Sequence, residues 1–360
     1  MTFHSVQHPL SGWVEHVDAS PSDKHQILVS IIIPCFEEKT TIANCLDAIL
    51  ANDFPKCSLE VLVVDGLSND GTRECISSYV STYPFIRLVD NPQQLTSCAL
   101  NCGIRLARGK YILILSGHIV VHSDFTRRTI EAMQDTNADG VGGIIRAQPR
   151  SHRHASLIIA ALLSSRFAVG NSYFRVGVQA PREVDTVPYG CYHRSVFQNG
   201  NVFNERLTRN QDLEFNLRLK HKGGKLFLCP AIQSTYYAPE TVSGFLRQNF
   251  RNGFWITYGL ASARSCFSIR HLVPLASVLV GTATLIAAVV YPPVLWLGFT
   301  LAGLYGLMNL YFSIQLSLQQ RSLLTFWYSG LFLLLHLSYG FGSLCGALAL
   351  LVKRVRGHDV

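Results

Sequence analysis

Polar side chains follow three apolar stretches of this sequence, at the points where each stretch ends. Glu37 comes directly after VSIIIPCF, Asp65 closes LEVLVVD, and Ser116 and His118 follow KYILIL. A carboxylate at such a position can accept hydrogen bonds from the N–H of a base or the hydroxyl of a ribose. Asp65 is therefore a candidate ligand-binding residue, whereas Glu37 either faces the same cleft or is a solvated loop residue.

Two further acids stand where helices are predicted to begin. Asp70 precedes Gly71 and Thr72, a pattern that suits a helix N-cap as well as ligand binding. Asp212 and Glu214 open a segment that continues as FNLRLKHK and ends at two glycines. Carboxylates in a first helical turn are favoured by the helix dipole. The residues alone therefore leave Asp212 open as a helix cap or a general base.

Strands and helices alternate along the chain and must position these side chains. Apolar runs predict strands at 29–36, 59–66, 85–91 and 110–118, and helical spacing predicts helices at 40–50, 70–80 and 94–107. This alternation indicates an α/β fold with a parallel sheet and helices on both faces. Ligands bind such sheets at the carboxyl ends of the strands. We therefore expect Asp65, His118 and Asp212 to converge on one cleft at that edge.

The C-terminal part of the chain has the composition of a membrane anchor. Hydrophobic residues make up 48% of the sequence and charged residues 15%, and the charge deficit is concentrated in residues 272–352. Apolar stretches at 272–291 and 294–313 and the uncharged stretch 323–352 each reach the length of about 20 residues that a helix needs to cross a bilayer. The sequence thus predicts two to four crossings.

Basic residues at the end of the chain bear on its orientation without deciding it. Lys353, Arg354 and Arg356 close the sequence, and positive residues favour the cytosolic side. Three crossings would place this cluster outside, whereas two or four would keep it inside. The first 27 residues form a polar lead-in without a basic start and apolar run, so no signal peptide is predicted and the globular part is expected in the cytosol.

Two helices are predicted to lie at the lipid surface. Residues 155–169 are apolar but too short to span a bilayer comfortably. Residues 243–261 mix Arg247 and Arg251 with aromatic side chains, as in an amphipathic helix of the headgroup region. An ordinary aromatic core helix is the alternative for this second segment. We expect the predicted cleft to open near this surface.

Charge and cysteine content exclude several other classes of protein. The net charge of +8 suits lipid headgroups or diphosphates better than nucleic acid, because no basic helix with interleaved aromatic residues is present. The ten cysteines contain no C-x-x-C pair and no spacing typical of zinc. They are predicted to be small core residues in a reducing compartment.

Four motifs, in this order, resemble family 2 of the inverting glycosyltransferases: VSIIIPCFEE, VLVVDGLSNDGT, ALNCGIRLARGKYILILSGH and RNQDLEFNLRLKHKGG. The resemblance covers residues 28–255. Four more motifs resemble bacterial succinoglycan-type membrane glycosyltransferases of exopolysaccharide synthesis: GNSYFR, YGCYHR, RQNFRNGFW and HLSYGFGSLCG. The resemblance implies a GT-A nucleotide-sugar-binding domain with a Rossmann-like mixed sheet at 28–262, followed by a transmembrane anchor at 263–360.

The resemblance also implies roles for individual residues. Those that would bind the nucleotide sugar are Pro34, Glu37, Asp65, Asp70 and Ser116, with Asp65 on the uracil or ribose. Asp212 would be the catalytic base, because it matches the acid ahead of the family's Glu-x-x-x-Arg helix. Those that would contact the diphosphate or the acceptor are Gln248, Arg251 and Trp255. Trp255 stands four residues past Arg251, whereas the family's Q-x-x-R-W element has the two adjacent.

One motif departs from the family pattern. Where the family has Asp-x-Asp, or Asp-Ala-His in this branch, the chain has Ser116-Gly117-His118. Serine is a poor ligand for Mg²⁺ or Mn²⁺, which prefer carboxylate oxygen. Three outcomes are open: His118 and the diphosphate hold the metal with waters, basic side chains replace the metal, or activity is lost.

The implied reaction is the inverting transfer of a sugar, by family default a UDP-hexose, to a polyprenyl-linked saccharide in the membrane. Two alternatives remain. A processive polysaccharide synthase would be expected to have a wider helical bundle, with helices on both sides of the catalytic domain. A degenerate, non-catalytic homologue acting as an assembly partner is motivated by the Ser116 substitution.

Overall fold

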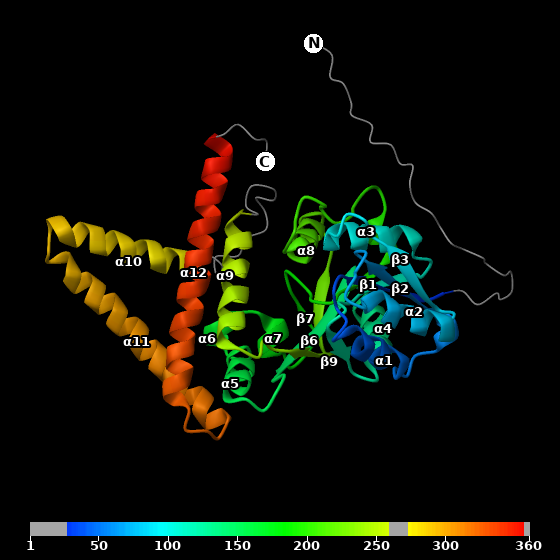
Figure 1. Ribbon diagram of the computed structural model, residues 1–360, viewed down its shortest axis with the longest axis horizontal. Helices are drawn as coiled ribbons and strands as arrows, with labels where there is room; N and C mark the ends of the chain where they lie inside the picture. The colour runs from blue at the N-terminus through cyan, green and yellow to red at the C-terminus, as the bar shows by residue number, and fades with distance from the viewer. Residues whose placement is uncertain (1–26, 259–272, 356–360) are drawn as a thin grey trace, which may run out of the picture.

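A computed structural model describes residues 27–258 and 273–355. It has an α/β body built on one sheet and three long C-terminal helices, with α5–α7 and α9 between them (Figure 1). The strands are β1 (Val29–Cys35), β2 (Leu59–Asp65), β3 (Ile86–Asp90), β4 (Tyr111–Ile114), β5 (Ile119–Val121), β6 (Gly140–Gln148), β7 (Arg182–Glu183), β8 (Cys191–His193) and β9 (Leu226–Tyr237). Their order is β3-β2-β1-β4-β8-β6-β9-β5, with β7 paired to β9.

The first half of the sheet is parallel, as predicted. β1 lies between β2 and β4, and β3 pairs with β2, so that Cys35 is opposite Asp65 and Asp65 is opposite Asp90. Alternate residues of β1 and β2 belong to two separate cores: Ile31 packs in one and Ile32 in the other. Burial on both faces explains why these strands are continuous apolar runs rather than alternating ones.

Helices cover both faces of the sheet and lead toward the anchor. They are α1 (Ile42–Leu50), α2 (Thr72–Thr82), α3 (Thr96–Leu106), α4 (Phe125–Thr136), α5 (His154–Leu162), α6 (Arg166–Val169), α7 (Tyr173–Val176), α8 (Gln211–His221) and α9 (Val242–Tyr258). Residues of α1, α2 and α4 pack in the core with Ile31, and those of α3 and α8 in the core with Ile32. The sheet therefore lies between two layers of helices.

The second half of the sheet is mixed, as the resemblance to the GT-A fold implies. β8 runs antiparallel to both β4 and β6, while β6 is parallel to β9. The strand predicted at 110–118 ends at Ile114, because the chain turns at Ser116, whose carbonyl accepts a hydrogen bond of 3.1 Å from the amide of Ile119. β5 then pairs antiparallel with β9.

The apolar helix predicted at 155–169 is two helices. α5 ends at Leu162, and α6 begins after Ser165, whose hydroxyl accepts a hydrogen bond from the amide of Phe167. Serine hydroxyls compete with the backbone for such bonds and so favour a new helix start over continuation.

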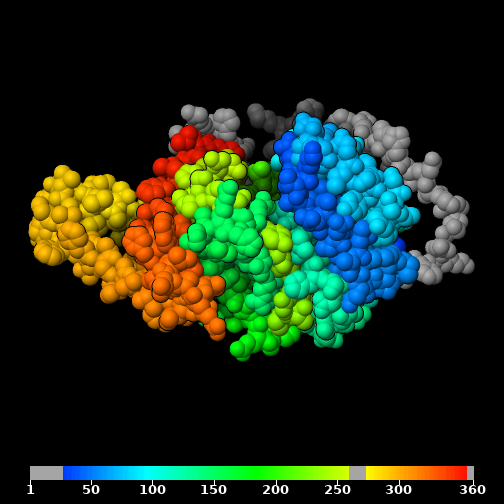
Figure 2. Space-filling view, turned by 60° about the horizontal axis from the view of Figure 1, so that its bottom comes forward, coloured from blue at the N-terminus to red at the C-terminus, as the bar shows by residue number. Residues whose placement is uncertain are grey.

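Three C-terminal helices are long and apolar enough to cross a membrane: α10 (Val273–Val290), α11 (Val294–Gln319) and α12 (Thr325–Val355). They differ in burial, because the most apolar windows of α10 and α11 are 11% and 6% buried, whereas that of α12 is 39% buried. Figure 2 shows α10 and the start of α11 projecting from the body, with α12 lying against it.

Glycines bring α12 into backbone contact with α9. A Cβ atom at Gly342 would collide with the carbonyl oxygen of Phe250, and one at Gly346 with that of Phe254. The hydroxyl of Thr257 on α9 donates a hydrogen bond of 2.6 Å to the carbonyl of Ser343 on α12. Small residues permit this close approach of two helices, which ties the anchor to the body.

The α9–α12 contact predicts a stability difference between two glycines of the same helix. Gly342→Ala should lower the free energy of unfolding by about 1–3 kcal/mol, because the added methyl forces the backbones apart. Gly330→Ala is the matched control, since nothing lies within 4 Å of a Cβ there, and alanine is the better helix former. Melting temperatures of the two variants in detergent check this. Equal or higher melting of Gly342→Ala would contradict the contact.

Candidate functional site

The carboxylate of Asp65 anchors the loop that follows β2. It is fully buried, and it accepts hydrogen bonds from the amide and hydroxyl of Ser68, at 2.9 and 2.6 Å, and from Nη1 of Arg73 at 3.0 Å. Arg73 also pairs with Asp90 at 2.8 Å. Oδ1 of Asp65 receives one of these bonds and Oδ2 two. Since each oxygen has two lone pairs, Oδ1 has one acceptor position left.

The loops after β1 and β2 are joined by hydrogen bonds. The amide of Glu37 donates to the Ser68 hydroxyl at 2.8 Å, and the exposed Glu37 has a left-handed φ of 52°. Asp70 accepts from the hydroxyl of Thr72 at 2.5 Å and from the amide of Lys39 at 3.3 Å. These hydrogen bonds lower the pKa of Asp70, and the bond from the Thr72 hydroxyl has the largest effect. Asp70 therefore supports the edge rather than projecting freely from it.

His118 contacts an acid that the sequence reasoning missed. Its Nδ1 lies 2.8 Å from Oε1 of Glu38 and 3.0 Å from the hydroxyl of Ser116. The other oxygen of Glu38 accepts from Thr41 at 2.6 Å. Burial raises the pKa of Glu38, but the bonds to His118 and Thr41 outweigh it and leave that pKa below 4.5. The sequence signal was the acidic pair after VSIIIPCF, of which the second member, not Glu37, meets His118.

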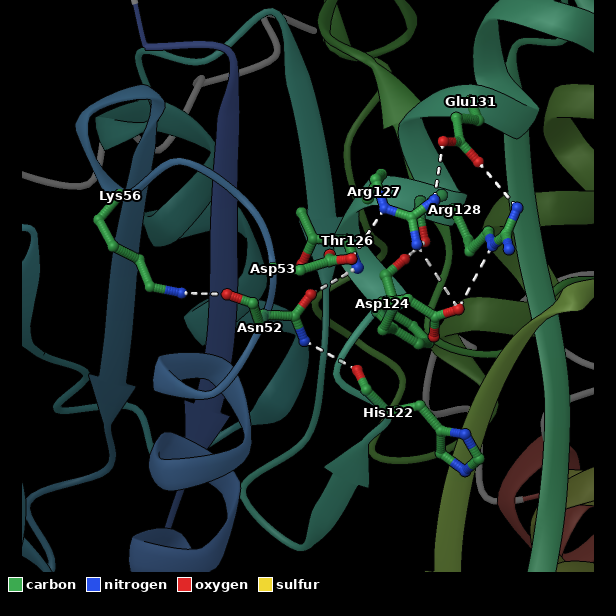
Figure 3. A network of polar contacts seen from close by, with 11 residues as sticks. Asn52, Asp53, Lys56, His122, Asp124, Thr126, Arg127, Arg128 and Glu131 are labelled. Carbon is green, nitrogen blue, oxygen red and sulfur yellow. Dashed lines mark hydrogen bonds and ion pairs between the residues drawn. The ribbon is translucent and has the colours of Figure 1, made fainter.

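A network around Asn52 holds the segment that carries Ser116 and His118 (Figure 3). The Asn52 side chain donates to the carbonyl of His122 at 2.9 Å and accepts from the amide of Thr126 at 2.9 Å. Asn52 thereby links the end of α1 to β5 and the start of α4. Because β5 begins one residue after His118, this network fixes the turn from which the imidazole projects.

The corner formed by Glu38 and His118 fits a cation only in part. In residues 27–258 and 273–355 no group of three or more His, Cys, Asp or Glu side chains is arranged to hold a metal ion. Glu38 and His118 offer one carboxylate oxygen and one imidazole nitrogen, a donor pair that suits Mn²⁺ better than Mg²⁺. Oxygens of a bound diphosphate would have to complete the shell.

Asp212 is the second residue of α8. Its side chain reaches solvent, yet the protein around it displaces enough water that desolvation raises its pKa. The neighbouring acid Glu214 is engaged by Arg218 at 2.7 Å within α8, whereas Asp212 has no ion pair with any described residue. Of the two acids in this turn, Asp212 is the one available for chemistry.

Tyr189 connects Asp212 with the Ser116 corner. Burial raises the pKa of Tyr189, and the neighbouring Asp212 and Cys45 act on that pKa in the same direction. The thiol of Cys45 in turn lies 3.4 Å from the carbonyl oxygen of Ser116. Tyr189 has a φ of 46°, an uncommon conformation for an aromatic residue that is often found at functional sites.

The three residues of α9 that were predicted to contact the diphosphate or the acceptor lie in two different environments. Nε2 of Gln248 donates to the hydroxyl of Tyr236 at 3.0 Å. Arg251 is exposed and lies near Arg209, whose pKa is lowered by burial and by the charge of Arg251. Trp255 sits one turn later, edge-to-face with Phe254 and Tyr258, so it belongs to an aromatic cluster rather than to the charged group.

A family model and individual relatives both match this chain, and they overlap in the residues they cover. The family model described as Glycosyl transferase family 2 matches residues 30–199. The chain is 32% identical over 254 residues to the dolichyl N-acetyl-alpha-D-glucosaminyl phosphate 3-beta-D-2,3-diacetamido-2,3-dideoxy-beta-D-glucuronosyltransferase of Methanococcus voltae, with 68% of this chain and 77% of that one covered. It is 23% identical over 294 residues to the succinoglycan biosynthesis protein ExoA of Rhizobium meliloti, covering 81% and 86%.

A solved structure shares the fold. The mannosyltransferase PcManGT from Pyrobaculum calidifontis, in complex with GDP-Man and Mn²⁺, superposes with a TM-score of 0.61 over 93% of this chain and 91% of that one. The sequence identity is 18%, so this likeness concerns the fold alone.

Proposed function

Because the chain belongs to glycosyl transferase family 2 and is a transferase with the GT-A fold, we propose that it moves a sugar from a nucleoside diphosphate sugar to a lipid-linked saccharide. One observation carries the proposal. Asp212, with its raised pKa, acts electrostatically on Tyr189, and so does Cys45, whose thiol contacts the carbonyl of Ser116 beside the Glu38–His118 corner.

Asp212 supplies the base in this proposal. The acceptor hydroxyl attacks the anomeric carbon from the face opposite the leaving diphosphate, Asp212 takes the hydroxyl proton, and the configuration inverts in a single displacement. The transition state is oxocarbenium-like, as in glycoside hydrolysis. A carboxylate whose pKa is raised toward the working pH is the stronger base.

The donor occupies the edge formed by the loops after β1, β2 and β4 in this proposal. The residues assigned to it are Pro34, Glu37, Asp65, Asp70 and Ser116. The exposure of Glu37 supports a hydrogen bond from a base or ribose to its carboxylate. A uridine nucleotide and a hexose remain the expectation from the family, and the Pyrobaculum enzyme was solved with GDP-Man.

A divalent metal fits this edge when the donor is bound. Mn²⁺, the ion in the Pyrobaculum complex, would be held by His118 and Glu38 with diphosphate oxygens, and it would offset the charge of the departing diphosphate. Gln248, Arg251 and Trp255 are assigned to the diphosphate or the acceptor.

The acceptor we propose is a polyprenyl-linked saccharide. The name of the Methanococcus relative describes transfer to a dolichyl phosphate-linked sugar. The apolar helices α10–α12 and the contact of α12 with α9, which carries Gln248 and Arg251, support delivery of such an acceptor from a bilayer.

We propose that α10 and α11 cross the membrane as a hairpin and that α12 stays at the cytosolic surface. Tyr328, Phe332 and Leu335 of α12 are buried against the body, in one core with α5 and Phe245 of α9. A third crossing would pull these residues and their partners into the bilayer. Two crossings keep Arg321 and the C-terminal cluster on one side, as positive residues prefer.

Cysteine labelling tests this topology. Pro292→Cys, at the tip of the hairpin, should react with a membrane-impermeant maleimide in intact cells, and Arg354→Cys, exposed at the end of α12, should react only after permeabilisation. The native cysteines provide the background to subtract. Labelling of Arg354→Cys in intact cells would show an odd number of crossings and contradict the hairpin.

A further inference from the structure

Arg175 on α7 is half-buried and has no ion pair with any described residue. Among residues 27–258 and 273–355, no group hydrogen-bonds its Nη1, which is shielded from solvent. The guanidinium carbon lies 5.4 Å from the ring centre of Tyr236 and 5.6 Å from that of Phe174. Burial lowers the pKa of Arg175, and the groups that oppose this are the phenols of Tyr236 and Tyr189. A half-buried charge of this kind is costly unless it is paired.

Other cations gather around the same tyrosine. Tyr236 is hydrogen-bonded to Gln248, and it acts electrostatically on Arg209, whose pKa the charge of Arg251 lowers. Arg209 donates to Asn252 at 3.2 Å and has no described carboxylate partner. Arg251 repels Arg209, and Arg175 lies against the same tyrosine that acts on Arg209. Arginines gathered in this way suit an anion that bears more than one negative charge.

This cluster lies between Asp212 and the apolar helices. Tyr189 is close to both Arg175 and Asp212. On the other side, α7 packs against α6, whose Phe167 stacks on Phe312 of α11 at 4.9 Å and meets Phe332 of α12 at 5.0 Å. A phosphate attached to a lipid therefore reaches Arg175 from the membrane side, whereas the donor diphosphate is assigned to the Glu38–His118 corner.

We propose that Arg175, together with Arg209 and Arg251, binds the phosphate of the lipid-linked acceptor. This inference rests on the proposed function and adds to it a recognition site for the lipid phosphate. The planar guanidinium suits a phosphate because it can donate two parallel hydrogen bonds. Binding would satisfy the unpartnered Nη1 and hold the acceptor sugar near Asp212.

Binding of short-chain analogues to the full-length protein in detergent tests the inference. The probes are citronellyl phosphate, citronellol, UDP and GDP. Wild type should bind citronellyl phosphate more tightly than citronellol, and Arg175→Gln should weaken binding of citronellyl phosphate at least about tenfold, the loss expected for a hydrogen bond to a charged group. Binding of the nucleotide should stay within about twofold of wild type.

The outcomes separate this inference from the proposed function. If wild type binds neither UDP nor GDP, the proposed function fails. If it binds a nucleotide but not citronellyl phosphate, or if Arg175→Gln binds citronellyl phosphate as wild type does, the acceptor-phosphate site is overturned. A loss confined to the nucleotide assigns Arg175 to the leaving diphosphate and also overturns it.

A second variant covers the case in which Arg175→Gln binds no probe at all. Arg175→Lys keeps the charge but loses the planar fork. Weaker binding of citronellyl phosphate with intact nucleotide binding supports the site, and unchanged binding of both overturns it. In the absence of ligand, Arg175→Gln should also melt at or above the wild-type temperature, because it removes an unpaired, half-buried cation.

Discussion

Asp212→Asn is expected to lower kcat for sugar transfer by about 10²–10⁴-fold, the usual contribution of a positioned general base. The amide has nearly the shape of the carboxylate but cannot take the proton of the acceptor hydroxyl. Transfer of labelled sugar to the lipid fraction of membranes measures the loss. Asp135→Asn, an exposed acid on α4, is the control and should leave transfer unchanged.

The raised pKa of Asp212 gives this prediction a pH dependence. The base must be ionised, so kcat/KM should fall as the pH drops through a pKa above the ordinary 3.8. Asp212→Asn should melt close to the wild-type temperature at pH 7, because the side chain is exposed and has no ion pair with any described residue. A variant that lost activity by unfolding would melt lower and bind no nucleotide.

Glu38→Gln and His118→Ala are expected to raise the Mn²⁺ concentration needed for half-maximal transfer by about 10–100-fold. The two side chains are 2.8 Å apart and are the donors that the protein offers at this corner. Titration of Mn²⁺ into chelator-treated membranes measures the shift. Glu74→Gln, an exposed acid on α2, is the control.

The same titration can contradict the metal assignment. If wild type transfers sugar equally with and without chelator, basic side chains, and not a metal, offset the charge of the departing diphosphate. If Glu38→Gln and His118→Ala lower transfer without changing the Mn²⁺ requirement, the pair orders the Ser116 turn instead. The lowered pKa of Glu38 keeps its carboxylate ionised at neutral pH, so a change in its protonation does not affect the comparison of the variants with wild type.

The parallel half of the sheet could be predicted because each of its strands is marked by a pattern within its own stretch of sequence. β1 and β2 are buried on both faces, and that environment produces continuous apolar runs that end in polar residues. The placement of Asp65 at a strand end followed directly. What could not be predicted was that Ser68 and Arg73 already occupy its carboxylate, since hydrogen-bond geometry is not encoded in spacing.

The resemblance implied a mixed sheet, but the strand pairings of the mixed half could not be predicted from the residues, because its strands are irregular. β6 contains a register shift between Gly142 and Ile144. A Cβ at Gly143 would collide with the carbonyl of Ile232, so the glycine permits an approach of two strands that are far apart in sequence. Neither periodicity nor an apolar run marks such a pairing.

Long-range partners account for the site residues that were missed. Glu38 and His118 are 80 positions apart, and the cluster of Arg175 and Arg209 is assembled by separate elements. For α12 a signal was present: Gly342 and Gly346 are four residues apart, a spacing typical of close helix packing. That spacing indicates a helix that packs closely against another helix.

The central claim is that Asp212 acts as the base of a sugar transfer at a membrane-facing edge of the sheet. The most direct test incubates membranes containing wild type or Asp212→Asn with a panel of labelled nucleotide sugars and measures both nucleotide binding and label in the lipid fraction. The account predicts that one nucleotide sugar labels lipid with wild type, and that the variant binds it without transfer. Near-normal labelling by Asp212→Asn would contradict the account.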